Sequence, residues 1–111
     1  MKNVYERINE LLGTDYKSDT DIDWFDISMN KSLSEDFIRE FCTKVDWYVI
    51  SEYQILSEGL IGEFQYNVNW YAISTFQKLS EGFIGEFKDK VIWGFTARVL
   101  QEFTKLLDNY I

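Results

Sequence analysis

The stretch VDWYVISEYQILSEGLIGEFQYN, residues 45–67, is followed directly by VNWYAISTFQKLSEGFIGEFKDK, residues 68–90. The two stretches agree at most positions, and each tryptophan of the chain lies 23 residues after the previous one. The four are Trp24, Trp47, Trp70 and Trp93. Agreement at this many places indicates a tandem repeat. Aligned on the tryptophans, the chain divides into an N-terminal segment and four units, the last shortened: 1–21, 22–44, 45–67, 68–90 and 91–111.

Each unit predicts two short helices. The first begins at the Trp, after an Asp or Asn that can cap a helix, and has Trp and Ile three residues apart on one face. The second begins after a Ser-Glu pair, in which Ser is the cap and Glu suits the positive end of the helix dipole. The predicted caps are Asp23, Asp46 and Asn69 for the first helices and Ser34, Ser57 and Ser80 for the second. Aromatic and β-branched residues are abundant, but apolar spacings of three and four rather than two favour helices over strands.

Helices this short are marginal alone, so they must be stabilised by stacking. We expect the Trp and Phe of one unit to bury against the next unit. The predicted fold class is therefore all-α: a short α-solenoid of four 23-residue helix-pair repeats, forming one domain over 1–111 behind an N-terminal capping helix.

The two ends depart from the repeat, as terminal repeats usually do. Within 1–13 we expect a helix that ends at Gly13. Its predicted inward residues are Val4, Ile8, Leu11 and Leu12. Residues 14–21 are predicted to be a polar connector. In the fourth unit Ile92 replaces the cap and Thr96 replaces the Ile, which predicts a longer closing helix, continuous or broken once.

The composition suits one packed, soluble domain. Of the 111 residues, 46% are hydrophobic and 18% aromatic, and 19 acidic residues against 11 basic ones give a net charge of −8. This charge disfavours direct binding to nucleic acid and favours a basic protein partner. Cys42 is the lone cysteine, which excludes an internal disulfide framework and fits a reducing, cytoplasmic setting. We interpret it as a packing residue. The start of the chain lacks the apolar run of a signal peptide, and no stretch is long enough to span a bilayer.

Nothing in the sequence predicts an enzyme, a cofactor or a metal site. There is no His, which removes imidazole-based catalysis and the commonest zinc ligand. Asp19, Asp21 and Asp23 alternate as at the start of a calcium loop, but the loop positions that require Gly and Glu hold Trp24 and Asn30. The GxxG in SEGLIGEF falls inside a predicted helix, which disfavours a nucleic-acid-binding loop.

The repeat cadence DWxxIS…Q.LSE.FI.EF resembles a tandem repeat of uncharacterised proteins of phages and large DNA viruses. It covers about four fifths of the chain, residues 22–111. It is carried by Asp46-Trp47, Ile50-Ser51, Gln54, Leu56-Ser57-Glu58, Ile61 and Glu63-Phe64, and again 23 residues later. The resemblance implies no known chemistry. It implies a phage- or virus-borne protein in the host cytoplasm, and small acidic phage proteins include inhibitors of host defence, anti-CRISPR proteins among them.

Glycines depart from this cadence at four positions inside the second helices, where the first unit has Asp36 and Arg39. Each helical Gly costs about 0.8–1 kcal/mol relative to Ala. Two interpretations stay open: close packing against neighbouring elements, or a bare strip on which a partner sits. Residues 45–67 carry a net −4, which is typical either of a solvated acidic face or of a binding face for a basic partner. The predicted partner-binding residues are Asp46, Tyr48, Glu52, Glu58, Gly59, Gly62, Glu63, Tyr71, Gly82 and Gly85.

The predicted function is that of an acidic protein–protein interaction module. Our hypothesis is a phage or viral inhibitor that acts as a nucleic-acid mimic and occupies the basic, nucleic-acid-binding surface of a CRISPR-type host defence protein. The alternative is a structural repeat protein that inhibits nothing and self-associates as a scaffold through its aromatic surface.

Overall fold

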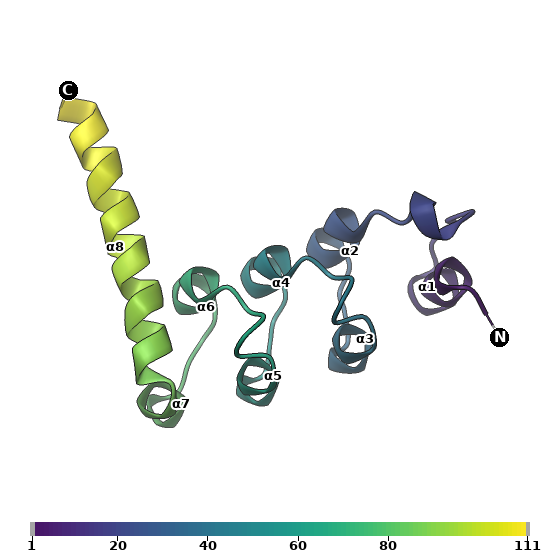
Figure 1. Ribbon diagram of the computed structural model, residues 1–111, viewed down its shortest axis with the longest axis horizontal. Coiled ribbons are helices and arrows are strands. Elements are labelled where there is room, and N and C mark those ends of the chain that lie inside the picture. The colour runs from purple at the N-terminus through teal and green to yellow at the C-terminus, as the bar shows by residue number, and fades with distance from the viewer. Residues whose placement is uncertain (1, 111) are drawn as a thin grey trace.

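The computed structural model describes residues 2–110, except for the side chains of 103 and 106–110. Within these residues the chain is entirely helical and contains no strand, which confirms the predicted all-α solenoid (Figure 1). The elements in chain order are α1 (Val4–Leu12), η1 (Asp19–Asp21), α2 (Trp24–Asn30), α3 (Glu35–Glu40), α4 (Trp47–Tyr53), α5 (Glu58–Glu63), α6 (Trp70–Phe76), α7 (Glu81–Glu86) and α8 (Lys88–Tyr110).

Three units fold as the predicted helix pairs: α2 with α3, α4 with α5, and α6 with α7. Every predicted cap is formed, and each capping side chain accepts a hydrogen bond from the backbone N–H three residues later. In the second unit, for example, Asp46 accepts from Val49 and Ser57 accepts from Leu60. Because an uncapped helix start leaves backbone donors unpaired, these residues fix where each helix begins.

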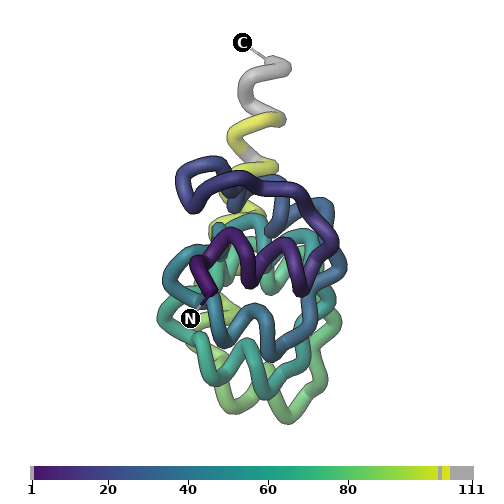
Figure 2. The backbone as a smooth tube through the Cα atoms, turned by 90° about the vertical axis from the view of Figure 1, so that its right-hand side faces the viewer, coloured from purple at the N-terminus to yellow at the C-terminus, as the bar shows by residue number. Residues whose placement is uncertain are grey.

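The helices lie in two rows. The first helices α2, α4 and α6 pack directly against one another in the upper row of Figure 1, and α3, α5 and α7 form the lower row. The backbones of the lower row lie farther apart, and a groove opens between α5 and α7. The molecule is a flat body of 53 × 39 × 18 Å. Figure 2, viewed from the N-terminal end, shows the successive units one behind another.

The core runs between the two rows. Its largest fully buried apolar residues are Ile8, Ile27, Ile38, Ile50, Leu60, Ile61 and Ile73. The Trp–Phe ring contacts found among the described residues form within a unit, which our expectation of burial against the next unit did not include. Trp24 lies 5.6 Å from Phe41 and Trp47 lies 4.9 Å from Phe64, measured between ring centroids. The Trp–Phe contact therefore closes each helix pair, and it ties the second helix to the first.

Polar side chains join one unit to the next. The buried hydroxyl of Ser28 accepts a hydrogen bond of 3.0 Å from the backbone N–H of Asp46. Gln54 reaches back into the preceding unit, where its Nε2 donates to the carbonyls of Ser28 (2.9 Å) and Lys31 (2.7 Å). Its Oε1 accepts from the backbone N–H of Leu33 at 3.2 Å. Gln54 is 7% exposed; its bond to Ser28 is buried, and its bonds to Lys31 and Leu33 are partly buried.

The same bonds recur 23 residues later. Ser51 accepts from the N–H of Asn69, and Gln77 bonds to Ser51, Gln54 and Leu56 in the preceding unit. The indole of Trp47 adds a further link, since its Nε1 donates to the carbonyl of Cys42 at 2.8 Å. We refer to the bonds made by Ser28, Ser51, Gln54 and Gln77 as the polar ladder.

The N-terminal helix α1 ends as predicted. Gly13 has φ 68°, a left-handed conformation that suits Gly, and its N–H donates to the carbonyl of Asn9. Ile8 is fully buried, and Val4 and Leu12 are partly buried. Leu11 was predicted to point inward, and this is wrong: it is 44% exposed, because α1 has only the first unit on one side.

The fourth unit is not a helix pair. Residues 88–110 form the single helix α8, which begins in the third unit and is unbroken. Trp93 is 61% exposed and therefore does not repeat the role of the other tryptophans. The physical reason is the loss of the cap at Ile92, which lets the preceding helix continue. The repeat also aligns Leu106, Leu107 and Tyr110 with Leu60, Ile61 and Phe64 of the second unit, but these three side chains lie outside the described ones.

Candidate interaction surface

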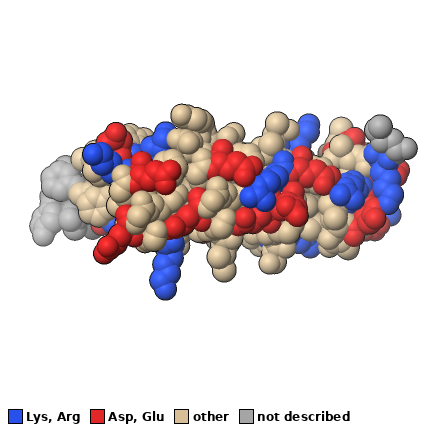
Figure 3. Space-filling view, turned by 90° about the horizontal axis from the view of Figure 1, so that it is seen from below, with Lys and Arg blue, Asp and Glu red and all other residues tan. Residues whose placement is uncertain are grey.

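The outer side of α3, α5 and α7 is strongly acidic. We call it the second-helix face. These three helices carry seven carboxylates and one arginine, Arg39, for a net charge of −6. The carboxylates are Glu35, Asp36, Glu40, Glu58, Glu63, Glu81 and Glu86. Each helix contributes a net −2, so most of the total of −8 lies on this one face. Figure 3 shows acidic side chains along its whole length, with basic groups among them.

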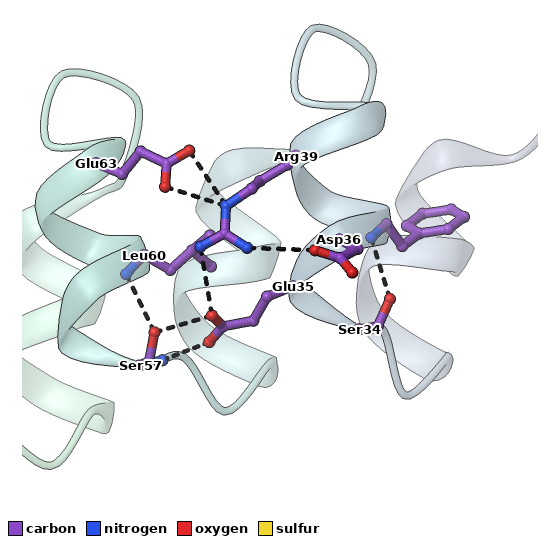
Figure 4. Close-up of polar contacts among 8 residues, drawn as sticks. Ser34, Glu35, Asp36, Arg39, Ser57, Leu60 and Glu63 are labelled. Carbon is purple, nitrogen blue, oxygen red and sulfur yellow. Dashed lines mark hydrogen bonds and ion pairs between the residues drawn. The ribbon is translucent and has the colours of Figure 1, made fainter.

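Two of these glutamates hold the next unit in place. Glu35 accepts from the backbone N–H and the hydroxyl of Ser57, both at 3.0 Å (Figure 4). Glu58 repeats this arrangement with Ser80, at 2.6 and 2.8 Å. The hydrogen bonds from Ser57 lower the pKa of Glu35. These two carboxylates are therefore already engaged within the molecule.

Two further glutamates form ion pairs with arginines on helices earlier in the chain. Arg39 Nε lies 3.0 Å from Glu63, and the same guanidinium approaches Glu35 and Asp36 (Figure 4). Arg7 on α1 forms a two-pronged pair with Glu40, at 3.0 and 3.1 Å. Hydrogen bonding to Arg7 lowers the pKa of Glu40. All these groups are at least one third exposed, and such surface pairs contribute about 0–1 kcal/mol each.

The remaining acids of the face are accessible. Asp36 is 97% exposed and makes only a long contact of 3.5 Å with Arg39. Glu81 and Glu86, at the two ends of α7, are exposed and have no ion-pair partner among the described residues. The position of Arg39 is Gly62 in the second unit and Gly85 in the third. The acidic character of the face is therefore less neutralised toward α7.

A groove of 390 Å³ separates α5 from α7. Gly59 and Gly62 lie on its α5 side, between the acid Glu58 at one end and Glu86 across the gap. The rings of Phe83 and Phe87 and the side chain of Gln65 complete its lining. The groove thus combines an apolar floor with carboxylates at its rim.

The structure separates the two interpretations of the glycines. A Cβ added at Gly62 would lie 3.3 Å from Phe87, so a side chain there would press on the groove floor. A Cβ added at Gly59 would make an ordinary van der Waals contact, and one added at Gly82 or Gly85 would have no neighbouring atom within 4 Å. Close packing therefore accounts for Gly62 alone, and the other three glycines leave the surface bare.

The predicted partner-binding residues do not form one site. Six of them lie on α5 and α7, at the second-helix face: Glu58, Gly59, Gly62, Glu63, Gly82 and Gly85. The other four belong to the first helices and their caps: Asp46, Tyr48, Glu52 and Tyr71. Tyr48 is 50% exposed, as expected for an outward residue, whereas Tyr71 is partly buried. Asp46 is committed to capping α4.

Sequence reasoning missed Gln54 and Gln77 as structural residues. The signal was present, since glutamine recurs in the two units that have a complete unit before them, while the first unit has Lys31 at this position. It also missed Gly94, a buried residue of α8. A Cβ there would clash with the carbonyl oxygen of Trp70 and lie 2.7 Å from the hydroxyl of Ser74. Gly94 therefore permits the close approach of α8 to α6.

The acidic N-terminal segment is explained by local structure. Asp19 accepts from the backbone N–H of Tyr5, Asp21 accepts from Lys17, and Asp23 caps α2. No group of three or more His, Cys, Asp or Glu residues is arranged to hold a metal ion in the described part of the chain. Among the described helices, none has both the length and the apolar character needed to cross a membrane.

Comparison with known proteins finds no matching family model, no matching curated protein and no matching solved structure.

Proposed function

We propose that this protein is a protein–protein interaction module that binds a basic protein surface through its second-helix face. The observation that carries the proposal is the charge of that face: seven carboxylates against one arginine on three short helices. Clustered charge of one sign attracts a complementary surface and speeds the encounter with it. The hydrogen bonds of Glu35 to Ser57 and of Glu58 to Ser80 support the same function, because they join α3 to α5 and α5 to α7 before any partner arrives.

The groove between α5 and α7 adds apolar contacts to the charge of the face. Apolar contacts at the centre of an interface usually carry most of the affinity, and charges at the rim set the partner and the rate. Phe83 and Phe87 form the floor, and Glu58 and Glu86 lie at the rim. We infer that a Lys or Arg side chain of the partner enters this groove, with its aliphatic stem on the rings and its cationic group at Glu86, since Glu58 is already engaged with Ser80.

The partner class we propose is a nucleic-acid-binding protein, because such a protein presents a basic surface. The axes of packed helices lie no closer than about 8–10 Å, so three helices in a row span at least about 16–20 Å. A net charge of −6 over that span is at most about one net charge per 3 Å. A DNA duplex carries one per about 1.7 Å. The face therefore suits competition for a basic surface better than close imitation of a duplex. The resemblance to phage and viral repeats makes a CRISPR-type host defence protein our specific candidate.

The test is capture of proteins from nuclease-treated lysate of the natural host, followed by mass spectrometry. The variant Glu81→Lys with Glu86→Lys reverses two accessible acids of the face. The matched control, Glu6→Lys with Asp15→Lys, makes the same change in net charge on exposed residues of the N-terminal segment.

We expect the wild type and the control to capture a basic protein, which added nucleic acid or 0.5 M salt releases. The face variant should lose it while keeping its helicity. Capture that survives in the face variant, or that is insensitive to salt, would refute the proposal. Open-ended oligomers without any captured partner would favour the scaffold alternative.

A further inference from the structure

The long helix α8 packs against the solenoid through a side of small residues. Gly94 is buried against the backbone of α6 at Trp70, and Ala97, one turn later, is partly buried. No larger residue fits at Gly94, so the rotation of α8 about its own axis is determined. The α6–α8 contact is the most extensive between any two helices of the fold.

This rotation turns the apolar side of α8 away from the solenoid. Five large apolar side chains on it are 46–61% exposed: Ile92, Trp93, Phe95, Val99 and Leu100. At about 100° per residue, Phe95, Val99 and Ile92 lie roughly 100–160° around the helix from Gly94 in one direction, and Trp93 and Leu100 lie roughly 100–120° from it in the other. We call these five residues the α8 stripe. Figure 1 shows α8 rising past α6 at the end of the solenoid.

The α8 stripe is comparable in size to the largest apolar patch of a typical monomer, and such patches are often functional. An aromatic side chain has about 150–250 Å² to bury, and at these exposed fractions the five side chains present on the order of 500 Å² in total. Monomeric soluble proteins rarely expose contiguous apolar patches beyond a few hundred Å². Two such stripes pressed together would bury on the order of 1,000 Å², the size at which a specific interface begins.

We propose that α8 pairs with α8 of a second copy of this chain, antiparallel, to form a two-fold dimer. A two-fold interface requires a patch that complements itself. The charged residues beside the stripe are self-complementary in this sense. Arg98 and Glu102 lie one turn apart near the middle of α8 and form no ion pair among the described residues. Antiparallel pairing about Val99 brings Arg98 of each copy near Glu102 of the other.

A membrane surface is a poorer occupant of the stripe. Helices that lie on membranes usually carry many Lys and Arg residues on their polar side, which attract anionic lipids. Here the described part of α8 mixes both signs, with Asp89 and Glu102 among its basic residues, and the whole protein carries −8. An anionic bilayer would therefore repel the molecule that presents the stripe.

The dimer leaves the proposed partner-binding function intact and is tested independently of it. The stripe and the second-helix face belong to different helices, so each copy keeps its acidic face. Two faces in one particle would increase avidity for a partner that presents two basic sites.

The first test is sedimentation equilibrium of the full chain. The wild type should sediment as a dimer at tens of micromolar. Ile92→Glu with Val99→Glu should weaken dimerisation at least about 100-fold, because each interface would then bury charges without partners. The control, Ile55→Glu with Phe76→Glu, replaces two exposed apolar residues elsewhere, 97% and 53% exposed, and should leave the dimer unchanged. Circular dichroism checks that all variants stay helical.

A second test reports the orientation of the two helices. In a Cys42→Ser background, Val99→Cys should form a disulfide-linked dimer under mild oxidation, since the two copies of this position meet at the two-fold axis. Ile92→Cys should not, because its two copies would lie about 21 Å apart at 1.5 Å per residue. Efficient linkage at Ile92 would overturn the antiparallel arrangement. A wild type that stays monomeric at 100 µM, or that instead binds phosphatidylcholine–phosphatidylserine vesicles, would overturn the dimer itself.

Discussion

Replacing Gln54 by methionine should destabilise the solenoid by about 3 kcal/mol. Methionine has nearly the same shape, so the change leaves packing almost unaltered and removes three hydrogen bonds. The carbonyls of Ser28 and Lys31 and the N–H of Leu33 then lose their partner in the next unit. Each such bond contributes about 0.5–1.5 kcal/mol net, and a buried group left unpaired costs about 1–3 kcal/mol. Since the bonds at Lys31 and Leu33 are partly exposed to water, we use the lower half of that range.

The assay is urea unfolding followed by tryptophan fluorescence and circular dichroism. With a slope of about 2 kcal/mol per molar urea, the midpoint should fall by about 1.5 M. That is a large change for a domain whose total stability is on the order of 5–15 kcal/mol. Gln101→Met, on an exposed part of α8, is the matched control and should stay within about 0.5 kcal/mol of the wild type. If Gln54→Met also stays within that margin, the polar ladder does not hold the units together.

Three further changes separate the other stabilising features. Gly94→Ala should destabilise the fold by about 1–3 kcal/mol, because its methyl group would clash with α6, and near-ultraviolet circular dichroism should report the altered tryptophan packing. Gly82→Ala and Gly85→Ala should each stabilise it by about 0.5–1 kcal/mol in the same unfolding assay, since their added methyl groups meet no neighbour. Unchanged stability would contradict either expectation. Glu35 has a folded pKa below its ordinary 4.5, so its contribution is present above pH 4.5 and is lost as the pH falls through the folded value. Glu35→Gln should therefore flatten the decline of the urea midpoint between pH 5 and pH 3, and an unaltered slope would count against the bonds to Ser57.

The helix boundaries were predictable because their causes are local. An N-cap acts on the backbone three residues later, and Gly13 ends α1 through its own φ angle. Such signals involve only residues within about one helical turn of each other, so they can be recognised in the sequence directly. The acidic composition of the second helices was equally visible, since Ser-Glu marks each start. These features sufficed to predict an all-α solenoid.

The partners of side chains were not predictable in the same way, because they depend on how the helices lie in space. The spacing of Trp and Phe is identical whether they stack within a unit or between units, and the structure shows the former at Trp47 and Phe64. Glu35 was interpreted as favourable to a helix dipole, yet it also binds Ser57 of the next unit. The rotation of α8 depends on a backbone contact at Gly94 that no periodicity reveals.

The polar ladder and the serine-bound glutamates also determine which acids a partner can use. Glu58 holds Ser80 through two short hydrogen bonds, so a cation that competed for it would loosen the third unit. Engaging Glu63 displaces only the exposed pair with Arg39, which costs about 0–1 kcal/mol. A cation that binds Glu81 or Glu86 displaces no ion pair among the described residues. Binding without loss of stability is therefore expected toward α7, where glycines replace the arginine and the groove opens. Charge reversal at Glu58 would therefore reduce binding both by destabilising the fold and by removing a contact, and the two effects could not be separated. Charge reversal at Glu86 would change binding alone.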